Sequence, residues 1–267
     1  MNILEEIMAH KREEVEERRE IYPVKLLERS LHFNAPIASM KKYLLNPDKS
    51  GIIAEFKRRS PSKGDINPFA SVEQVSLGYM QAGSSGLSVL TDKTFFGGSS
   101  EDLMIAREWN FCPILRKDFI IDEYQVYETR SIGADLILLI AGCLSAAQVA
   151  HLARVAKNIG LEVLLEVHSS AELEKLCDEV DLVGVNNRDL QTFTLNVETS
   201  LRLADLIPEG FIKISESGIS NPQSIIDLKG AGYRGFLIGE YFMQTANPAR
   251  TCKMFIQAFQ EKGNLVT

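Results

Sequence analysis

Residues 136–167 decide the fold class, because they contain LILLI (Leu136–Ile140), then SAAQVAHLARVAKNIG (Ser145–Gly160), then EVLLEV (Glu162–Val167). The first and last runs are short and rich in Ile, Val and Leu, which is typical of parallel strands covered on both faces. The middle run opens with a Ser-x-x-Gln capping signal, carries apolar residues at helical spacing and ends at a glycine, as a helix does. This stretch therefore predicts one strand–helix–strand unit.

The same alternation of short apolar runs and helical stretches extends over most of the chain. Eight strands, each followed by a helix, predict an α/β fold of the (βα)8 TIM-barrel class. The alternative is a doubly wound open sheet, which usually carries GxGxxG after its first strand, and here RRSP (residues 58–61) stands there instead. We therefore favour the barrel. The expected strands are Gly51–Lys57, Gly86–Thr91, Pro113–Lys117, Leu136–Ile140, Glu162–Val167, Leu182–Asn186, Ile212–Glu216 and Gly235–Gly239.

Capping signals indicate where several helices begin. In each signal a Ser or Asp side chain is expected to accept the backbone N–H three residues later, while a Gln returns the contact. Before the last helix, a proline at the first helical position serves as the start signal. The signals are Ser71 with Gln74, Asp122 with Gln125, Ser145 with Gln148, Ser220 with Gln223, and Asn247 before Pro248.

A chain of 267 residues is long enough for one barrel preceded by an extension. We expect a single domain, 1–267, in which residues 1–48 form an N-terminal helical extension and residues 49–267 form the barrel. The extension predicts an amphipathic helix that is either a solvated helix packed on the barrel or a lid over one mouth, and the sequence supports both readings equally. Its apolar side would consist of Ile3, Leu4, Ile7 and Val15.

The composition excludes several classes of protein. The 45 % hydrophobic and 24 % charged residues are typical of an ordinary soluble globular protein. A net charge of −7 argues against a nucleic-acid partner but not against a small anionic substrate, because the charge of a site is local. The longest apolar run, Leu136–Leu144, is too short to cross a membrane, which takes about 20 residues, and the charged N-terminus is not a signal peptide.

The cysteines and histidines show no metal-binding or redox spacing. The chain has four Cys and four His, without a CxxC pair or an HxxxH motif, so we interpret them as structural or surface residues and expect no metal site. A cytoplasmic protein with reduced thiols and no membrane contact follows. No long apolar stripe or heptad run demands a partner chain, so we expect a monomer.

Charged and polar side chains interrupt the apolar runs at the carboxyl ends of the expected strands, where a barrel builds its active site. Glu55 and Lys57 share one parity and therefore face the same side of the first strand. Charges gathered in one cavity need partners or a chemical task, and neighbours of both signs shift one another's pKa as acid–base chemistry requires. The candidates are Glu55, Lys57, Lys117, Glu166, Asn186, Arg188, Glu216 and Ser217, whereas Asp92, Arg116 and Asp118, each taken alone, are expected to be solvated loop residues.

Small residues after the seventh and eighth strands predict a phosphate site. Ser217 and Gly218 follow one strand and Gly239 ends the next, so backbone N–H groups can reach phosphate oxygens there. Glu240 is an awkward neighbour for an anion, and we expect it to contribute only its N–H or to point away. The basic loop Arg58–Asp65 is interpreted either as a surface loop or as a flap over an anionic ligand.

Seven motifs, one in nearly every strand–helix unit and all in order, resemble those of the indole-3-glycerol phosphate synthase family. The similarity runs from the N-terminal extension to the last helix, and the length fits the single-function form of that family. The motifs are IAEFKRRSPS (53–62), SVLTDKTFFGGS (88–99), LRKDF (115–119), LEVH (165–168), VNNRDL (185–190), SESGI (215–219) and LIGE (237–240).

This resemblance implies a tryptophan-biosynthesis enzyme that converts 1-(2-carboxyphenylamino)-1-deoxyribulose 5-phosphate to indole-3-glycerol phosphate, without metal or organic cofactor. Lys117 would then be the general acid at the ketone, and Glu166 would stabilise positive charge on the ring nitrogen and help to remove a proton. Lys57 and Arg188 would hold the anionic ends of the substrate. By the same resemblance, Glu55 and Glu216 would orient the lysines and serve the dehydration, and Asn186 and Ser217 would bind hydroxyls of the substrate. The phosphate would be surrounded by Lys57, Ser217, Gly218, Gly239 and Glu240. The slot for the benzoate ring would be formed by Pro61, Phe95, Phe119 and Leu190.

Two other functions remain open at this stage. A related barrel isomerase acting on phosphoribosyl anthranilate would share the phosphate loops, but a Cys/Asp pair would be expected at the ends of its first and fifth strands. Here Glu55, Lys57 and Glu166 stand at those positions. A non-catalytic barrel that binds a phosphometabolite would not need three carboxylates and two lysines together. The residues alone do not divide the acid and base roles between the two lysines or among the three glutamates.

Overall fold

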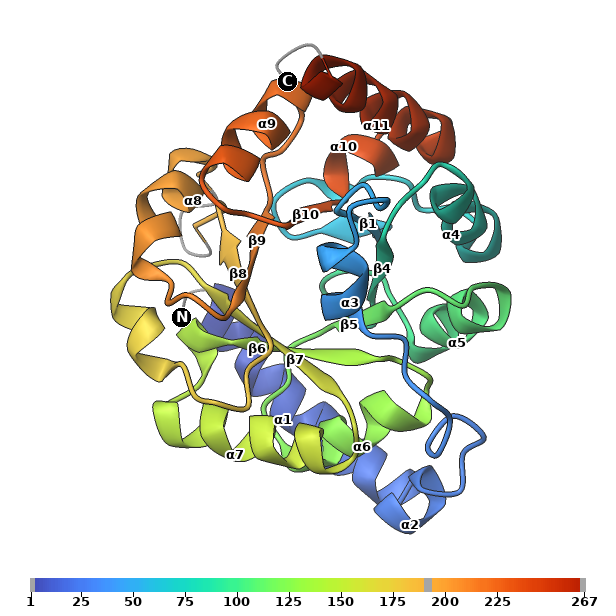
Figure 1. The fold of residues 1–267 in the computed structure, drawn as a ribbon. Helices are drawn as coiled ribbons and strands as arrows, with labels where there is room; N and C mark the ends of the chain where they lie inside the picture. Colours follow the sequence, from blue (N-terminus) through green and yellow to red (C-terminus); the bar gives the residue numbers. More distant parts are fainter. Residues whose placement is uncertain (1–2, 190–193, 265–267) are drawn as a thin grey trace.

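In a computed structural model that describes residues 3–189 and 194–264, eight parallel strands close into a barrel. Each strand pairs with the next barrel strand along the chain, and β1 closes the ring by pairing with β10 (Figure 1). The predicted TIM barrel is confirmed, and the observed strands differ from the expected ones by at most one residue at either end. The barrel strands are β1 (Ile52–Phe56), β4 (Gly86–Leu90), β5 (Ile114–Lys117), β6 (Leu136–Ile140), β7 (Glu162–Val167), β8 (Leu182–Asn186), β9 (Ile212–Glu216) and β10 (Gly235–Ile238).

Helices surround the barrel, with two departures from the expected pattern. β7 is followed by the 3₁₀ segment η2 (Ala171–Lys175) rather than by an α-helix, because few residues connect it to β8 and 3₁₀ turns suit such short pieces. The first loop carries a small antiparallel pair, β2 (Arg59–Ser60) and β3 (Gly64–Asp65). The remaining elements of the barrel are α4 (Val72–Gln81), α5 (Ser100–Trp109), α6 (Glu123–Ser131), η1 (Ala141–Cys143), α7 (Ala146–Asn158), α8 (Glu198–Leu203), η3 (Ala204–Leu206), α9 (Pro222–Gly230), α10 (Glu240–Met243) and α11 (Pro248–Asn264).

The capping signals locate the helix starts with one exception. Asp122 and Ser145 form complete capping boxes, and Ser71 accepts the N–H of the third residue of α4. The predicted cap Ser220 is wrong by one residue, because Asn221 caps α9. Pro222 occupies the first helical position, and a proline there favours an extended residue directly before it.

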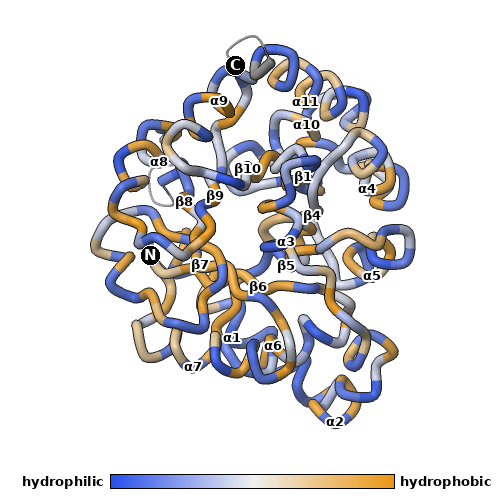
Figure 2. The backbone as a smooth tube through the Cα atoms, viewed as in Figure 1, coloured by the Kyte–Doolittle hydropathy of each residue, from blue (hydrophilic) through white to orange (hydrophobic). Residues whose placement is uncertain are grey.

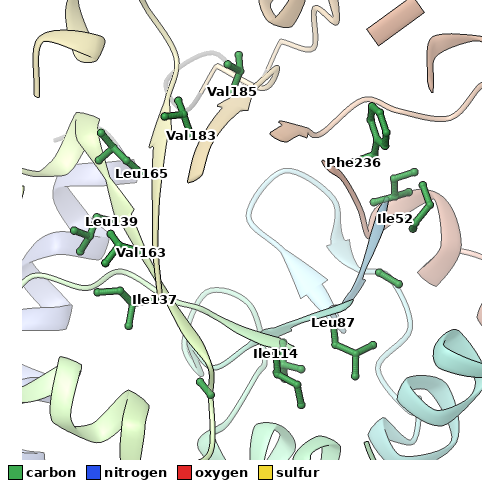
Figure 3. Close-up of a cluster of buried hydrophobic side chains, with 14 of the residues drawn as sticks. Ile52, Leu87, Ile114, Ile137, Leu139, Val163, Leu165, Val183, Val185 and Phe236 are labelled. Atoms are coloured by element: carbon green, nitrogen blue, oxygen red, sulfur yellow. The ribbon is translucent and has the colours of Figure 1, made fainter. Parts of the chain in front are cut away.

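The apolar side chains form two shells. An outer cluster fills the space between the strands and the helices, and Figure 3 shows part of it, including Ile52, Leu87 and Val163. An inner cluster fills the barrel itself and includes Ile53 and Leu164. The barrel strands are correspondingly among the most hydrophobic parts of the chain (Figure 2). Alternate residues of each strand thus feed alternate shells, as the two-residue period requires.

The N-terminal extension contains α1 (Ile3–Ile21), α2 (Val24–Leu27) and α3 (Met40–Leu45), and it contributes to the inner cluster. Met40 and Leu44 of α3 and Ile7 of α1 pack against the residues inside the barrel. α1 and α2 also contact α6, beside which they run in Figure 1. None of the described helices combines the length and the apolar character that a bilayer span requires.

Candidate active site

A cavity of about 260 Å³ opens at the carboxyl ends of the barrel strands. The topology accounts for it, because parallel strands end on the same side of a barrel and their last residues face one another across the mouth. Nearly all residues that the sequence singled out line this cavity. They are Glu55, Lys57, Pro61, Lys117, Phe119, Glu166, Asn186, Arg188, Glu216, Ser217, Gly218, Gly239 and Glu240.

Lys117 lies between two carboxylates from other strands. Its Nζ is 2.6 Å from Glu166 Oε2 and 3.4 Å from Glu216 Oε2. Asn186 Nδ2 donates to Glu166 Oε1 at 3.1 Å, and His168 Nε2 lies 3.7 Å from the same oxygen. Five side chains from β5, β7, the residue after β7, β8 and β9 thus form one connected cluster around Lys117 and Glu166.

The two carboxylates beside Lys117 are held in different protonation states. Burial opposes the charged form of Glu166, but the Lys117 ammonium outweighs it and lowers the pKa of Glu166 to about 2. Burial, with the charges of Glu166 and Glu55, raises the pKa of Glu216 to about 8, although Lys117 opposes the shift. Burial also opposes the charge of Lys117, but the carboxylates of Glu166, Glu216 and Glu55 raise its pKa above the usual value. Near neutral pH the site therefore holds an ammonium, a carboxylate and a carboxylic acid side by side.

Two glycines make room for these carboxylates. A Cβ at Gly184, on β8, would lie 2.1 Å from Glu216 Oε1, and a Cβ at Gly239 would lie 2.4 Å from Glu55 Oε1. Such distances are far below van der Waals contact, so a side chain at either position would displace a carboxylate. Glu55 Oε1 in turn accepts from Lys57 Nζ at 2.7 Å, which confirms that both face the same side. Gly184 could not be predicted as a site residue from the sequence, because it lies inside the apolar strand β8.

The turn after β9 has an unusual backbone conformation. Ser217 has a φ of 67° and Gly218 a φ of 73°, and among the described non-glycine residues Ser217 alone has a positive φ. A non-glycine residue is strained in this region and is usually held there by its surroundings at a functional site. Asn187 does so, because its Nδ2 donates to the carbonyl oxygens of Glu216 and Ser217 at 3.0 and 3.1 Å. Successive backbone N–H groups in a turn can form a concave surface that binds anions, so this turn is a candidate anion site.

Glu240 binds a cation rather than pointing away from the site. Its Oε2 accepts from Arg188 Nη2 at 2.9 Å, and Arg188 Nη1 donates to Ser62 Oγ at 3.2 Å. Lys63 lies 3.8 Å from the other oxygen of Glu240. The basic first loop therefore reaches the cavity through this cluster, which favours its interpretation as a flap over that of a plain surface loop.

The apolar wall differs from the predicted one at two positions. Phe96 lines the cavity and packs against Phe119, with ring centroids 6.1 Å apart, whereas Phe95 lies outside the lining and packs edge-on against His10. Leu190 lies outside the described residues, and Leu195 is among the residues that line the cavity. Three side chains of α1 complete the wall, which favours the interpretation of the extension as a lid. These are Ile3, Leu4 and Ile7.

The expectation that Asp92, Arg116 and Asp118 are solvated is wrong, because all three are at most 2 % exposed. Arg116 Nη2 pairs with Asp118 at 3.0 Å and with Glu128 of α6 at 2.6 Å. Asp92 and Asp118 both face Lys11 of α1, which covers them from solvent. Lys11 of the N-terminal extension is thus the partner that the sequence did not reveal for Asp92 and Asp118.

The sequence matches one protein family over nearly its whole length. Residues 4–255 match the family model described as Indole-3-glycerol phosphate synthase. The chain is similar to the indole-3-glycerol phosphate synthases of Bacteroides thetaiotaomicron, with 48 % identity over 259 residues, and of Laribacter hongkongensis, with 41 % over 252. These alignments cover 97 % and 92 % of this chain and 99 % and 96 % of the relatives.

Solved structures of distant barrels share the fold. They include 3-hexulose-6-phosphate synthase from Salmonella typhimurium, with a TM-score of 0.61 and 14 % identity, and KGPDC from Streptococcus mutans, with 0.58 and 12 %. Both cover 79 % of this chain, and the chain covers 99 % and 97 % of them, respectively. At such low identity the likeness establishes the architecture alone.

Proposed function

The chain belongs to the indole-3-glycerol phosphate synthase family, and from this premise we propose that the cavity at its barrel mouth is the site of the family's reaction. The enzyme is a carboxy-lyase of tryptophan biosynthesis. It converts 1-(2-carboxyphenylamino)-1-deoxyribulose 5-phosphate to indole-3-glycerol phosphate by ring closure, decarboxylation and dehydration. The observation that carries the site assignment is the position of Lys117 between an ionised Glu166 and a protonated Glu216.

Substrate binding uses the turns after β9 and β10 together with the basic side chains beside them. The phosphate takes the N–H groups of Ser217, Gly218 and Gly239, and Lys57 supplies a nearby positive charge. The carboxylate of the benzoate lies toward Arg188, which is already held in place by Glu240 and Ser62. The ring lies in the apolar slot, and Asn186 and Ser217 bind substrate hydroxyls. The lining residues of the slot are Pro61, Phe96, Phe119, Leu195 and the three apolar side chains of α1.

Ring closure uses Lys117 as a general acid. The ring carbon that bears the carboxylate attacks the ketone, and Lys117 gives its proton to the oxygen as negative charge develops there. Electron release from the ring nitrogen leaves positive charge on that atom, and the nearby Glu166 carboxylate stabilises it. Carbon dioxide then leaves, and its bonding electrons restore the aromatic ring.

Dehydration uses the two glutamates in opposite roles. Glu216 protonates the departing hydroxyl, and Glu166 takes the proton from the carbon next to the nitrogen to complete the indole. The opposite pKa shifts of the two groups support this division, because an acid must hold its proton and a base must lack one. Overall one proton is consumed, which matches the negative charge lost as the carboxylate becomes carbon dioxide. Glu55 orients Lys57.

The direct test supplies the carboxyphenylamino sugar phosphate to the purified protein and follows indole fluorescence together with released carbon dioxide. Both products are expected in equal amounts. A barrel isomerase would turn over phosphoribosyl anthranilate instead, and a binding protein would retain the ligand unchanged. We propose a monomeric enzyme, and we place it in the cytoplasm.

Replacing Phe119 with alanine is expected to raise KM about tenfold with a smaller change in kcat. The ring is 8 % exposed and packs in the slot, so its loss removes apolar contact with the bound benzoate ring. Steady-state kinetics below the melting temperature of the variant measure the effect, and Phe119→Leu should show a smaller rise. Unaltered kinetic constants would remove Phe119 from the substrate site.

Replacing Glu216 with glutamine is expected to lower kcat about tenfold and to abolish its decline at high pH. In the unchanged enzyme kcat should fall as pH rises through about 8, because Glu216 then loses the proton that it must donate. A glutamine has no such proton to lose, so the step near pH 8 should disappear. Carbon dioxide should also appear ahead of indole in the variant, since dehydration is the step that slows. A retained alkaline step would assign it to another group.

A further inference from the structure

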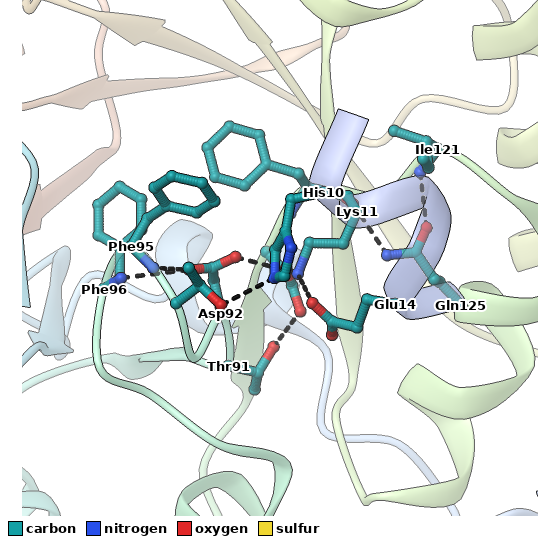
Figure 4. Close-up of polar contacts among 12 residues, drawn as sticks. His10, Lys11, Glu14, Thr91, Asp92, Phe95, Phe96, Ile121 and Gln125 are labelled. Carbon is teal, nitrogen blue, oxygen red and sulfur yellow. Dashed lines mark hydrogen bonds and ion pairs between the residues drawn. The ribbon is translucent and has the colours of Figure 1, made fainter. Parts of the chain in front are cut away.

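A buried lysine joins the N-terminal helix to the carboxyl ends of two barrel strands. The Lys11 side chain is 0 % exposed, and its Nζ lies 3.0 Å from Asp92 Oδ2, 3.0 Å from Asp118 Oδ1 and 2.8 Å from Glu14 Oε2. Figure 4 shows Lys11 reaching from α1 toward the loop that carries Asp92. Burying an ammonium away from water is unfavourable unless carboxylates beside it compensate for the lost hydration. Here they do, so the lysine is charged and is fixed in position.

The two barrel carboxylates that Lys11 contacts also organise the cavity wall. Asp92 Oδ1 accepts the N–H of Phe96 at 3.2 Å, and the Phe96 ring lines the cavity. Asp118 Oδ1 accepts the N–H of Phe119 at 2.8 Å, and Asp118 directly follows Lys117. The same ammonium therefore faces the two carboxylates that hold the backbone of Phe96 and of Phe119, one aromatic residue in each wall loop.

The residues of α1 that line the cavity lie within the two helical turns before this lysine. Ile7 precedes Lys11 by four positions, so both lie on the same face of the helix, and Ile3 lies one turn earlier still. Two other ionic contacts of α1 with the barrel lie further along the helix from its cavity-lining residues, between Arg18 and Glu128 and between Arg19 and Asp122. Lys11 is the buried anchor nearest to the part of α1 that lines the cavity.

We propose that Lys11 is a positioning residue for the reaction, because its contacts with Asp92 and Asp118 hold α1 against the barrel mouth as a wall of the substrate cavity. The proposal rests on the proposed function of that cavity. Lys11 itself touches no reacting atom. Its loss should therefore weaken substrate binding far more than it slows the chemical steps at Lys117.

The main test replaces Lys11 with methionine, which has a similar length and no charge. We expect KM for the carboxyphenylamino sugar phosphate to rise about tenfold or more while kcat stays within about threefold. Trypsin should also cleave faster at Arg12, Arg18 or Arg19, and saturating substrate should slow this cleavage again. A purely structural role would lower the melting temperature and leave KM unchanged at temperatures where the variant is folded, and that result would overturn the proposal.

Three further variants make the test specific. Glu14→Gln removes the partner of Lys11 on its own helix and leaves both barrel contacts, so KM should stay within twofold of the unchanged enzyme. Asp92→Asn keeps the Oδ1 acceptor for Phe96 but removes the charge that faces Lys11, and KM should rise about threefold. Combining Lys11→Met with Asp92→Asn should raise KM by less than the product of the single increases, because both remove one interaction.

Asp92→Asn also decides the question if Lys11→Met fails to fold. The substitution preserves size and backbone contacts, so it leaves a folded protein to assay. An unchanged KM in that variant would overturn the proposal. Turnover by the unchanged enzyme in the same assay tests the proposed function separately, since it depends on no variant.

Discussion

Replacing Lys117 with methionine is expected to lower kcat about a thousandfold, the largest effect of any single substitution in this barrel. General acids contribute about 10²–10⁴-fold, and Lys117 is the cation that lies between the two catalytic glutamates. Methionine fills a similar volume but carries neither the proton nor the charge. The alkoxide that forms on ring closure would have no donor, so neither carbon dioxide nor indole should appear at a significant rate.

Two controls separate the lost proton from a lost fold. Lys117→Arg keeps a positive charge between Glu166 and Glu216, but its planar guanidinium does not place an N–H where the compact ammonium does, so activity should stay low while product binding persists. Lys157→Met removes a lysine that pairs with Asp181 at the surface, and its kinetics should be unchanged. If Lys117→Met kept more than a tenth of normal kcat, another group would be the acid.

The fold and the charged centre of the site follow from simple patterns in the sequence. Strands covered on both faces carry few charges, so Glu55, Lys117, Glu166 and Glu216 mark the strand ends that face the cavity. Closure of the sheet then brings together residues as distant in the sequence as Glu55 and Glu216, so the barrel topology is sufficient to predict that they meet. This is why strand ends could be predicted well and why their convergence followed from topology alone.

The aromatic wall could not be predicted in the same way. Phe95 and Phe96 are neighbours in a loop, and nothing periodic in the sequence decides which ring faces inward. In the structure Asp92 Oδ1 accepts both of their backbone N–H groups and so sets the turn. The conformation of this loop thus depends on Asp92, which the sequence predicted to be solvated and which is buried in the structure.

The buried charges around α1 show a second limit. Asp92 and Asp118 are each isolated charges after strands, and such residues are usually solvated. Their partner, Lys11, lies about 80 and about 110 positions away in a helix that also looks like an ordinary charged surface helix. No spacing rule connects them, because the contact depends on where the extension packs rather than on the register of the barrel.

Replacing Glu166 with glutamine is expected to lower kcat about a hundredfold or more between pH 6 and 9. Glu166 is the carboxylate that stays ionised, because Lys117 lowers its pKa to about 2. It stabilises the positive nitrogen in ring closure and accepts the last proton in dehydration, and an amide does neither. Both carbon dioxide and indole should therefore slow together, in contrast to Glu216→Gln, where carbon dioxide precedes indole.

The comparison of these two isosteric substitutions identifies which glutamate is the base. Glu166→Gln should keep a decline of kcat at high pH, because that decline belongs to Glu216, but should move it to lower pH, since the Glu166 carboxylate helps to raise the pKa of Glu216. Glu216→Gln should remove the decline and leave ring closure nearly intact. If instead Glu166→Gln abolished the alkaline step and Glu216→Gln kept it, the acid and base would have to be exchanged, with Glu216 serving the nitrogen and Glu166 the departing hydroxyl.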